Sequence, residues 1–166
     1  MVERRGAQVR EVNQTHIETR IEVCVPPRQL FAYFRPGRIG YWYGPETKTE
    51  FEVSDGAGEF AVAQKVRISG RVARREVSHT AVVTQCQWGS VLEWSFEDRS
   101  GLRGTERWDF EPIDINGAAG TLLRMTCDYR MKGIVARAAN WLLTRHAVAR
   151  RNRAYLARLK KLAEPD

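Results

Sequence analysis

The chain has 166 residues, of which 43% are hydrophobic and 28% charged, a composition that is typical of one globular domain and excludes a disordered or collagen-like chain. No apolar run reaches the roughly 18 residues of a membrane-spanning helix, no apolar stretch follows Met1 as a secretory signal requires, and the three cysteines suit neither a disulfide framework nor a metal site, so we expect a cytoplasmic protein. The net charge is +7, and residues 132–166 carry the whole excess, since the basic and acidic side chains before them cancel.

Residues 1–13 are polar and lack periodicity, which predicts a loose N-terminal tail. Between residues 15 and 25 apolar and polar side chains alternate, which is the period of a half-buried strand. Pro26 and Pro27 end this strand, because proline cannot continue the hydrogen-bond ladder of a sheet. A short helical segment is expected next at 27–34, and a second short helix or a loop at 39–43.

Six further strands are predicted, at 47–53, 60–68, 72–87, 91–97, 105–111 and 122–131. Tight connections join nearly all of them, which predicts a mostly antiparallel sheet of six or seven strands. In the strand at 60–68 the inward row is expected to contain Phe60, Val62, Gln64, Val66 and Ile68.

The last third of the chain changes period. From about Gly133 to Ala163 apolar residues recur every three or four positions, as in an amphipathic helix. Such a helix is roughly 45 Å long at 1.5 Å per residue, against an expected radius of gyration of about 15 Å. We therefore expect it to cross the whole domain, with Trp141 and Leu142 buried.

Four segments carry a resemblance to a known family. "VCVPPRQLFAYF" resembles the first strand and helix of the START-like helix-grip superfamily (SRPBCC), in its polyketide cyclase/dehydrase and lipid-transport branch. "GTERWDFEP" is similar to that family's penultimate strand, "ARAANWLLTRHAVARRNRAYLARLKKLAE" to its last helix, and "YWYGP" to a segment of a related chaperone-activator branch. The likeness covers nearly everything after residue 14, and fold alone does not settle function.

The resemblance implies an α+β helix-grip fold over residues 14–166. A curved antiparallel sheet of six or seven strands wraps around a long C-terminal helix, and two short helices follow the first strand. An apolar cavity between sheet and helix would bind a small hydrophobic or aromatic ligand and orient it with a few polar groups.

The residues themselves suggest which polar groups face that cavity. Strand parity and helical spacing predict five inward polar side chains: Gln64, Glu106, Tyr129, Arg145 and Asn152. A carboxylate in an apolar cavity can act as a general acid or base, and an arginine fork can bind a carboxylate or enolate. Glu106, Arg145 and Tyr129 are therefore the candidate catalytic residues, and Gln64 and Asn152 are candidate ligand contacts.

Each of these residues also has a purely structural interpretation. Glu106 and Arg145 could form an ion pair, and Arg145 could instead reach solvent past the edge of the helix. Asn152 could be a satisfied interior amide, and Tyr129 could fill the core with its hydroxyl bonded at the rim.

Aromatic residues complete the predicted ligand site. Trp42 and Tyr43 lie on a short connection that would border the cavity mouth, so a ligand lid is predicted there. Trp94, Trp108 and Trp141 would line the cavity wall, and core packing is the simpler interpretation for Trp94 and Trp108, which lie in the middle of predicted strands.

Other chemistries lack their motifs. His16, His79 and His146 are not spaced as metal ligands, and no nucleophile elbow, phosphate loop or dinucleotide fingerprint occurs, so neither a metal nor a cofactor is predicted. The basic side chains of the last helix, Arg150, Arg151 and Arg153 among them, are expected to form a solvated face. Contact with an anionic membrane surface is the second interpretation, and nucleic acid is the weakest, because no groove-reading motif accompanies the charge.

The sequence thus predicts a small-molecule-binding protein, with two functions left open. One is a polyketide cyclase/aromatase or dehydratase that folds a flexible polyketone against apolar walls, where proximity and orientation supply most of the effect. The alternative is a non-catalytic lipid or quinone carrier or a partner-binding module.

Overall fold

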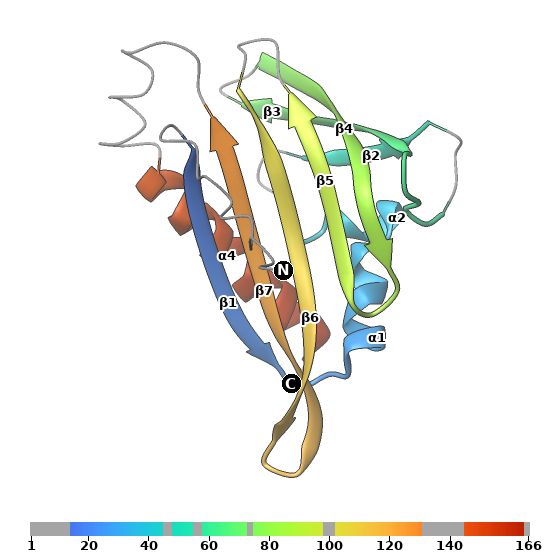
Figure 1. The fold of residues 1–166 in the computed structure, drawn as a ribbon, viewed down its shortest axis with the longest axis vertical. Coiled ribbons are helices and arrows are strands. Elements are labelled where there is room, and N and C mark those ends of the chain that lie inside the picture. The colour runs from blue at the N-terminus through green and yellow to red at the C-terminus, as the bar shows by residue number, and fades with distance from the viewer. Residues whose placement is uncertain are drawn as a thin grey trace, which may run out of the picture.

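A computed structural model describes residues 14–44, 48–54, 58–72, 75–97, 102–130 and 145–164. Seven strands form one antiparallel sheet in the order β1-β7-β6-β5-β4-β3-β2 (Figure 1). Their bounds are β1 Thr15–Val23, β2 Glu50–Val53, β3 Lys65–Val72, β4 Arg75–Gln87, β5 Val91–Glu97, β6 Arg103–Ile115 and β7 Ala118–Arg130. The predicted antiparallel sheet is confirmed, and its first strand pairs with its last.

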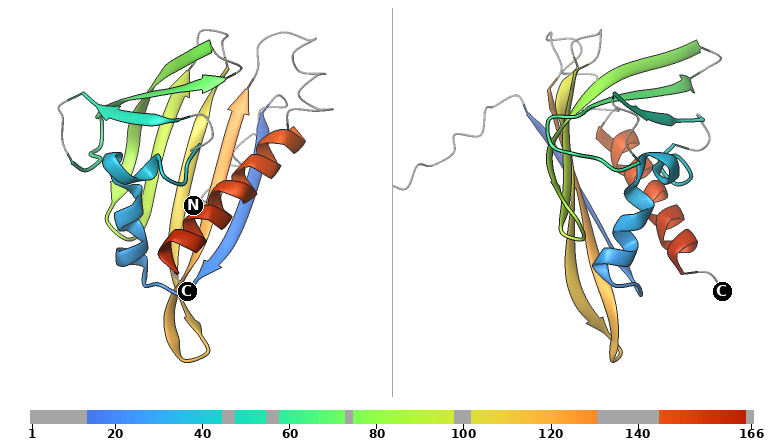
Figure 2. Two further views of the ribbon diagram at one scale, coloured as in Figure 1. Left: turned by 180° about the vertical axis from the view of Figure 1, so that it is seen from behind. Right: turned by 90° about the vertical axis from the view of Figure 1, so that its right-hand side faces the viewer.

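The sheet is curved, and the helices of the described residues lie on one side of it (Figure 2). In the side view, β2, β3 and the upper part of β4 bend over toward the helices, while the lower part of the sheet stands upright. This gives the sheet an inner face that meets the helices and an outer face that meets solvent. Alternate side chains of each strand belong to opposite faces.

Three short helical turns follow β1: α1 (Pro27–Phe31), η1 (Ala32–Phe34) and α2 (Pro36–Ile39). Both α1 and α2 begin with a proline, whose missing N–H costs nothing in the first turn of a helix. They turn Leu30, Phe31, Phe34 and Ile39 toward the sheet, where all four are buried. Short helices after the first strand are thus confirmed, but the second one lies at Pro36–Ile39 and residues 40–43, part of the predicted segment, form turns.

The C-terminal helix α4 (Arg145–Ala163) packs against β1 across the inner face (Figure 2). Its buried side chains are Asn152, Tyr155, Leu156 and Leu159. Hydrogen bonds hold its last turns, since Lys160 Nζ donates to the Glu22 carbonyl at 2.8 Å and Tyr33 Oη to the Leu162 carbonyl at 3.1 Å. The predicted start of this helix, with Trp141 and Leu142, lies outside the described residues.

The core between the sheet and the helices is unusually rich in aromatic rings. Trp94 and Trp108 pack edge to face with their ring centroids 4.6 Å apart, and the ring of Phe34 lies 4.7 Å from that of Trp42 and 4.9 Å from that of Phe110. Large rings bury the most apolar area per residue, so these contacts dominate the packing of the inner face.

One predicted strand position is wrong. Val62 is 59% exposed, because β3 begins only at Lys65 and residues 58–64 form a loop. In that loop Gln64 is still buried, since its side-chain oxygen accepts a hydrogen bond from the Ala61 N–H at 3.1 Å. A loop has no fixed alternation of faces, so the period of two cannot be extended into it.

Candidate functional site

A buried carboxylate lies at the centre of the inner face. Glu106 belongs to β6, between Trp94 of β5 and Cys127 of β7 in the register of the sheet. The alternation along β6 turns it inward together with Trp108 and Phe110, and only 4% of the residue is exposed. An ionisable group in such a place needs hydrogen-bond partners that replace its water.

Three elements of the fold supply those partners. Tyr43 Oη donates to Glu106 Oε2 at 2.7 Å, and Trp94 Nε1 donates to the same oxygen at 3.3 Å. The other oxygen, Oε1, accepts from Arg151 Nη2 of α4 at 3.3 Å and lies 3.9 Å from the Cys127 thiol. Both carboxylate oxygens are therefore engaged, and Arg151 brings the counter-charge.

Arg151 reaches this carboxylate from the rim of the interior. Its side chain is 38% exposed, whereas the Glu106 side chain is 6% exposed. Its guanidinium also lies 5.6 Å from the ring centroid of Tyr155. Burial lowers the pKa of the Arg151 guanidinium, but the acidic groups around it, Glu106 among them, raise that pKa overall, so the group stays charged.

The neighbouring acids are kept in their protonated forms. Burial, and then the charge of Glu106, raise the pKa of the Tyr43 hydroxyl well above its ordinary value. The same two causes raise the pKa of the Cys127 thiol. Tyr43 is therefore a lasting hydrogen-bond donor, and Cys127 is not a reactive thiolate.

Two further donors of this region are buried. Asn152 is fully buried, and its Oδ1 accepts hydrogen bonds from Arg151 Nε at 3.3 Å and Nη2 at 3.2 Å. None of the described residues offers an acceptor to Asn152 Nδ2 or to the indole Nε1 of Trp108.

The chain that forms this site matches a known family over almost its whole length. The family model described as polyketide cyclase / dehydrase and lipid transport matches residues 14–164. The chain belongs to this family. No curated protein matches it.

Solved structures share the fold of this polyketide cyclase/dehydrase family member at low sequence identity. The aromatase/cyclase ZhuI of Streptomyces sp. R1128 is 18% identical with a TM-score of 0.62, and the match covers 92% of this chain and 97% of that one. Truncated norcoclaurine synthase of Thalictrum flavum is 10% identical with a TM-score of 0.66, covering 92% and 95%. A protein of Deinococcus radiodurans is 18% identical with a TM-score of 0.60, covering 90% and 98%. These likenesses establish the START-like helix-grip fold, which the sequence motifs predicted.

The arginine predicted to face inward is the wrong one. Arg145 is exposed, as are the two residues after it, because none of the described residues packs over the first turn of α4. Arg151, predicted to be solvated, contacts Glu106 instead, whereas Arg150 and Arg153 are exposed as predicted. Arg151 lies one position from the apolar stripe and four from Tyr155, and its long side chain spans the remaining distance.

Both residues of the predicted lid are buried, and a role toward a ligand stays a prediction for them. Trp42 is fully buried, and its Nε1 donates to the Tyr33 carbonyl at 2.9 Å, so it is part of the core. Tyr43 is buried against Glu106, and Tyr41 is the exposed member of the segment, at 71%.

The remaining predicted site residues have mixed positions. Tyr129 is buried in a separate small cluster with Ile17 and Cys127, two residues along β7 from the thiol beside Glu106. Trp94 and Trp108 are fully packed around the carboxylate, Gln64 stabilises its own loop, and Trp141 lies outside the described residues.

A cavity of about 530 Å³ lies on the opposite side of the sheet. Its lining side chains come from outward positions of β4 to β7 and from Gln14, among them Ser95, Thr105, Arg103 and Asp128. It is open and lined by polar and apolar groups alike, and it lies on the other face from the apolar cavity predicted between sheet and helix. That inner cavity stays a prediction, because residues 131–144, which precede α4, are outside the described part.

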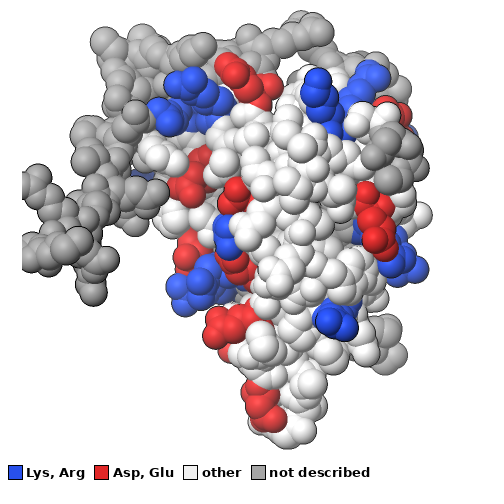
Figure 3. All heavy atoms as spheres, turned by 45° about the vertical axis from the view of Figure 1, so that its right-hand side comes forward, with Lys and Arg blue, Asp and Glu red and all other residues white. Residues whose placement is uncertain are grey.

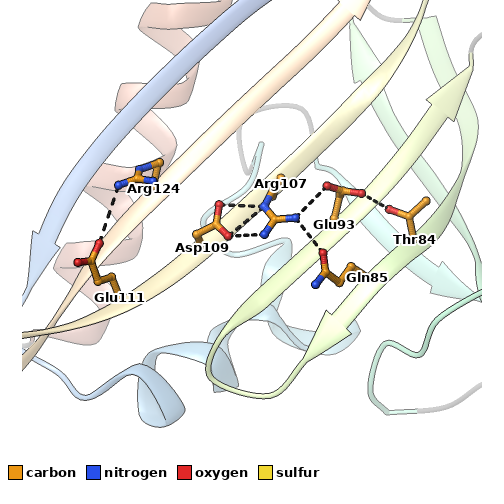
Figure 4. Close-up of polar contacts among 7 residues, drawn as sticks. All are labelled: Thr84, Gln85, Glu93, Arg107, Asp109, Glu111 and Arg124. Atoms are coloured by element: carbon orange, nitrogen blue, oxygen red, sulfur yellow. Dashed lines mark hydrogen bonds and ion pairs between the residues drawn. The ribbon is translucent and has the colours of Figure 1, made fainter. Parts of the chain in front are cut away.

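The outer face carries a network of partly exposed charged side chains, centred on Arg107, the residue that follows Glu106. Arg107 points outward and donates to Asp109 at 2.7 Å and 2.9 Å, to Gln85 at 2.8 Å and to Glu93 at 3.3 Å (Figure 4). A bulge in β4 between Val83 and Gln85 places both Thr84 and Gln85 near Glu93 and Arg107. Basic and acidic side chains are interspersed along the margins of a broad uncharged area on the face shown in Figure 3.

Two further observations concern other partners. In the described ranges, no three His, Cys, Asp or Glu side chains are grouped so that they could hold a metal ion. Within the same ranges, no helix is both long and apolar enough to cross a membrane.

Proposed function

We propose that this protein binds a small hydrophobic or aromatic molecule between the inner face of its sheet and α4. The observation that carries the proposal is the ion pair of Glu106 and Arg151, placed among aromatic rings at the rim of the interior. An apolar core gains little from such a pair, and hydrophobic replacements are often as stable. Polar groups retained in an apolar interior are typical of functional sites.

The positions of these polar groups suit a ligand that enters from the rim of the interior. Arg151 is half-exposed and would meet a ligand first, whereas Glu106, Tyr43 and Asn152 are buried behind it. Apolar rings would enclose the body of the ligand, and these few polar groups would fix its orientation. The membership of the family and the shared fold support the same use of the interior.

A cyclase/aromatase or dehydratase reaction would use the same groups. Glu106 would accept an acidic α-proton of a polyketone, Arg151 would stabilise the enolate oxygen, and the protonated Glu106 would return that proton to the oxygen that leaves as water. Glu106 would first have to release one of its donors, since both of its oxygens are engaged. That engagement favours the alternative, a carrier that binds without turnover.

Binding and turnover should be measured together on a panel of fatty acids, quinones and aromatic polyketides. We expect saturable binding at one site, weakened about tenfold or more by Arg151→Met, which removes the charge at the rim. Arg107→Gln on the outer face is the control and should bind as the parent does. Product formation would identify an enzyme, and tight binding without product a carrier. If no member of the panel binds, the proposal is wrong.

A further inference from the structure

Two buried donors on the inner face lack acceptors, and they define what the ligand must carry. Asn152 Nδ2 and Trp108 Nε1 are both inaccessible to solvent, and neither has a partner among the described residues. Both belong to the surroundings of the ion pair. Arg151 Nη2 contacts Asn152 and Glu106 together, and the Trp108 ring lies 6.3 Å from that of Tyr43.

The orientation of the Asn152 amide follows from its neighbour. Two N–H groups of Arg151, Nε and Nη2, point at Asn152 Oδ1. A rotated amide would direct its own NH₂ group at these donors, so the hydrogen bonds assign oxygen to this side. The NH₂ group therefore points away from the guanidinium, and its lack of an acceptor does not come from a misplaced oxygen.

Buried donors without partners destabilise a folded protein, and native proteins keep few of them. A ligand oxygen placed beside Asn152 Nδ2 or Trp108 Nε1 would remove this cost. A ligand without an acceptor would leave the cost in place, so the two donors discriminate between otherwise similar apolar molecules.

The charges of the site set a second condition. Glu106 and Arg151 already neutralise each other. A ligand carboxylate near Asn152 would add a second negative charge close to Glu106, and one half-exposed guanidinium would have to compensate both. A neutral acceptor, such as a ketone oxygen, avoids this repulsion.

Building on the proposed function, we infer that Asn152 and Trp108 are specificity-determining residues that select a neutral carbonyl group on an aromatic ligand. The inner site then prefers aromatic ketones both to hydrocarbons of the same shape and to carboxylates such as fatty acids. This preference distinguishes aromatic ketones from fatty acids and hydrocarbons, which the fold alone does not distinguish.

Three probes of nearly the same shape test this inference. Fluorenone carries a neutral carbonyl, fluorene has no acceptor, and fluorene-9-carboxylate carries a negative charge. Equilibrium dialysis of the full chain should give a dissociation constant about tenfold lower for fluorenone than for fluorene, with the carboxylate weakest. The infrared carbonyl stretch of bound fluorenone should lie below its value in an alkane, because the oxygen accepts hydrogen bonds.

Two variants assign the effect to the two donors. Trp108→Phe and Asn152→Leu should each bring the dissociation constants of fluorenone and fluorene closer together and return the carbonyl stretch toward its alkane value. The control is Thr121→Val, which removes the buried hydrogen bond of Thr121 Oγ1 to the Val25 carbonyl at 2.6 Å near the end of β1. It should leave the preference for fluorenone intact. If Asn152→Leu does not fold, the parent protein and Trp108→Phe still decide the question.

Equal affinity for fluorenone and fluorene would overturn the inference and leave the proposed function standing, since a buried water would then satisfy the donors. Tightest binding of the carboxylate would overturn it in the same way. If none of the three probes and no member of the earlier panel binds, the proposed function and this inference are both wrong.

Discussion

Glu106 and Arg107 are adjacent on β6, yet they belong to opposite faces and to two different kinds of charge network. On the inner face, the 4% exposed Glu106 is held by a phenol, an indole and a half-exposed arginine. On the outer face, Arg107 is held by Asp109, Glu93 and Gln85, with 36% of its side chain exposed. Each network contains an arginine and a glutamate, and both are built on the same strand.

The comparison shows that surroundings, more than the number of hydrogen bonds, decide what a charge contributes. The two arginine side chains are about equally exposed, at 36% for Arg107 and 38% for Arg151, so the difference lies in their acidic partners. Asp109 and Glu93 are 32% and 24% exposed, and water can replace a broken contact there, whereas Glu106 is only 6% exposed. Around Glu106, protein groups have replaced water, so a broken contact leaves a buried donor or acceptor without a partner. Four measurements test this difference, beginning with the largest expected effect.

Replacing Glu106 by Ala should lower the free energy of unfolding by about 3 kcal/mol, because it leaves the Tyr43 hydroxyl and the Trp94 indole without an acceptor and opens a small cavity. Urea unfolding followed by circular dichroism measures this loss. Glu93→Ala on the outer face is the matched control and should cost less than about 1 kcal/mol. Similar losses for the two variants would contradict the comparison.

Arg151→Met should lower the free energy of unfolding by about 1–2 kcal/mol, less than a fully buried ion pair would, because the guanidinium is half-exposed. Arg145→Met on the same helix should change it by less than about 0.5 kcal/mol, since Arg145 is exposed. Thermal and urea unfolding of both variants make the test. If Arg145→Met lowered the free energy of unfolding by more than Arg151→Met does, Arg145 would be the inward arginine.

Alkaline pH should reduce the stability that the buried hydroxyl of Tyr43 contributes beside Glu106. Burial and the charge of Glu106 raise its pKa well above the ordinary value of 10.0. Above about pH 10 the unfolded chain releases this proton while the folded protein keeps it. The stabilisation is therefore complete below pH 10 and is lost as the pH rises toward the folded pKa.

The measurement is the difference in unfolding free energy between the parent and Tyr43→Phe from pH 8 to pH 11. This difference should shift against the parent above pH 10, by at most about 1.4 kcal/mol per pH unit. Tyr41→Phe, at the 71% exposed neighbouring tyrosine, is the control. A pH-independent difference for Tyr43→Phe would mean that Tyr43 is not held in its protonated form by the fold.

The outer network should give the smallest effect. Arg107→Gln is expected to cost less than about 1 kcal/mol, and added salt should reduce that cost further, because solvent screens charges on this face. Unfolding at low and high ionic strength measures both quantities. A loss as large as that of Glu106→Ala, unaffected by salt, would show that the outer face is not screened.

The sequence by itself determined the strands, the face of most inward residues and the fold family. Alternation placed Glu106 inward with Trp108, and helical spacing placed Asn152 inward with Tyr155, because both periods are local properties of the backbone. Local patterning placed residues on the wrong face where local regularity ended. Val62 lies in a loop, and Arg145 lies in a first helical turn that the described part of the fold does not cover.

Only the tertiary structure decided which groups meet. Tyr43 is 63 residues from Glu106 along the chain, and Arg151 is 45 residues from it. Periodicity says which face a side chain belongs to, but says nothing about its partner on the facing element. It therefore could not choose Arg151 over Arg145, nor Tyr43 over Trp42. The curvature of the sheet and the position of α4 across it made those choices, and with them the chemistry of the site.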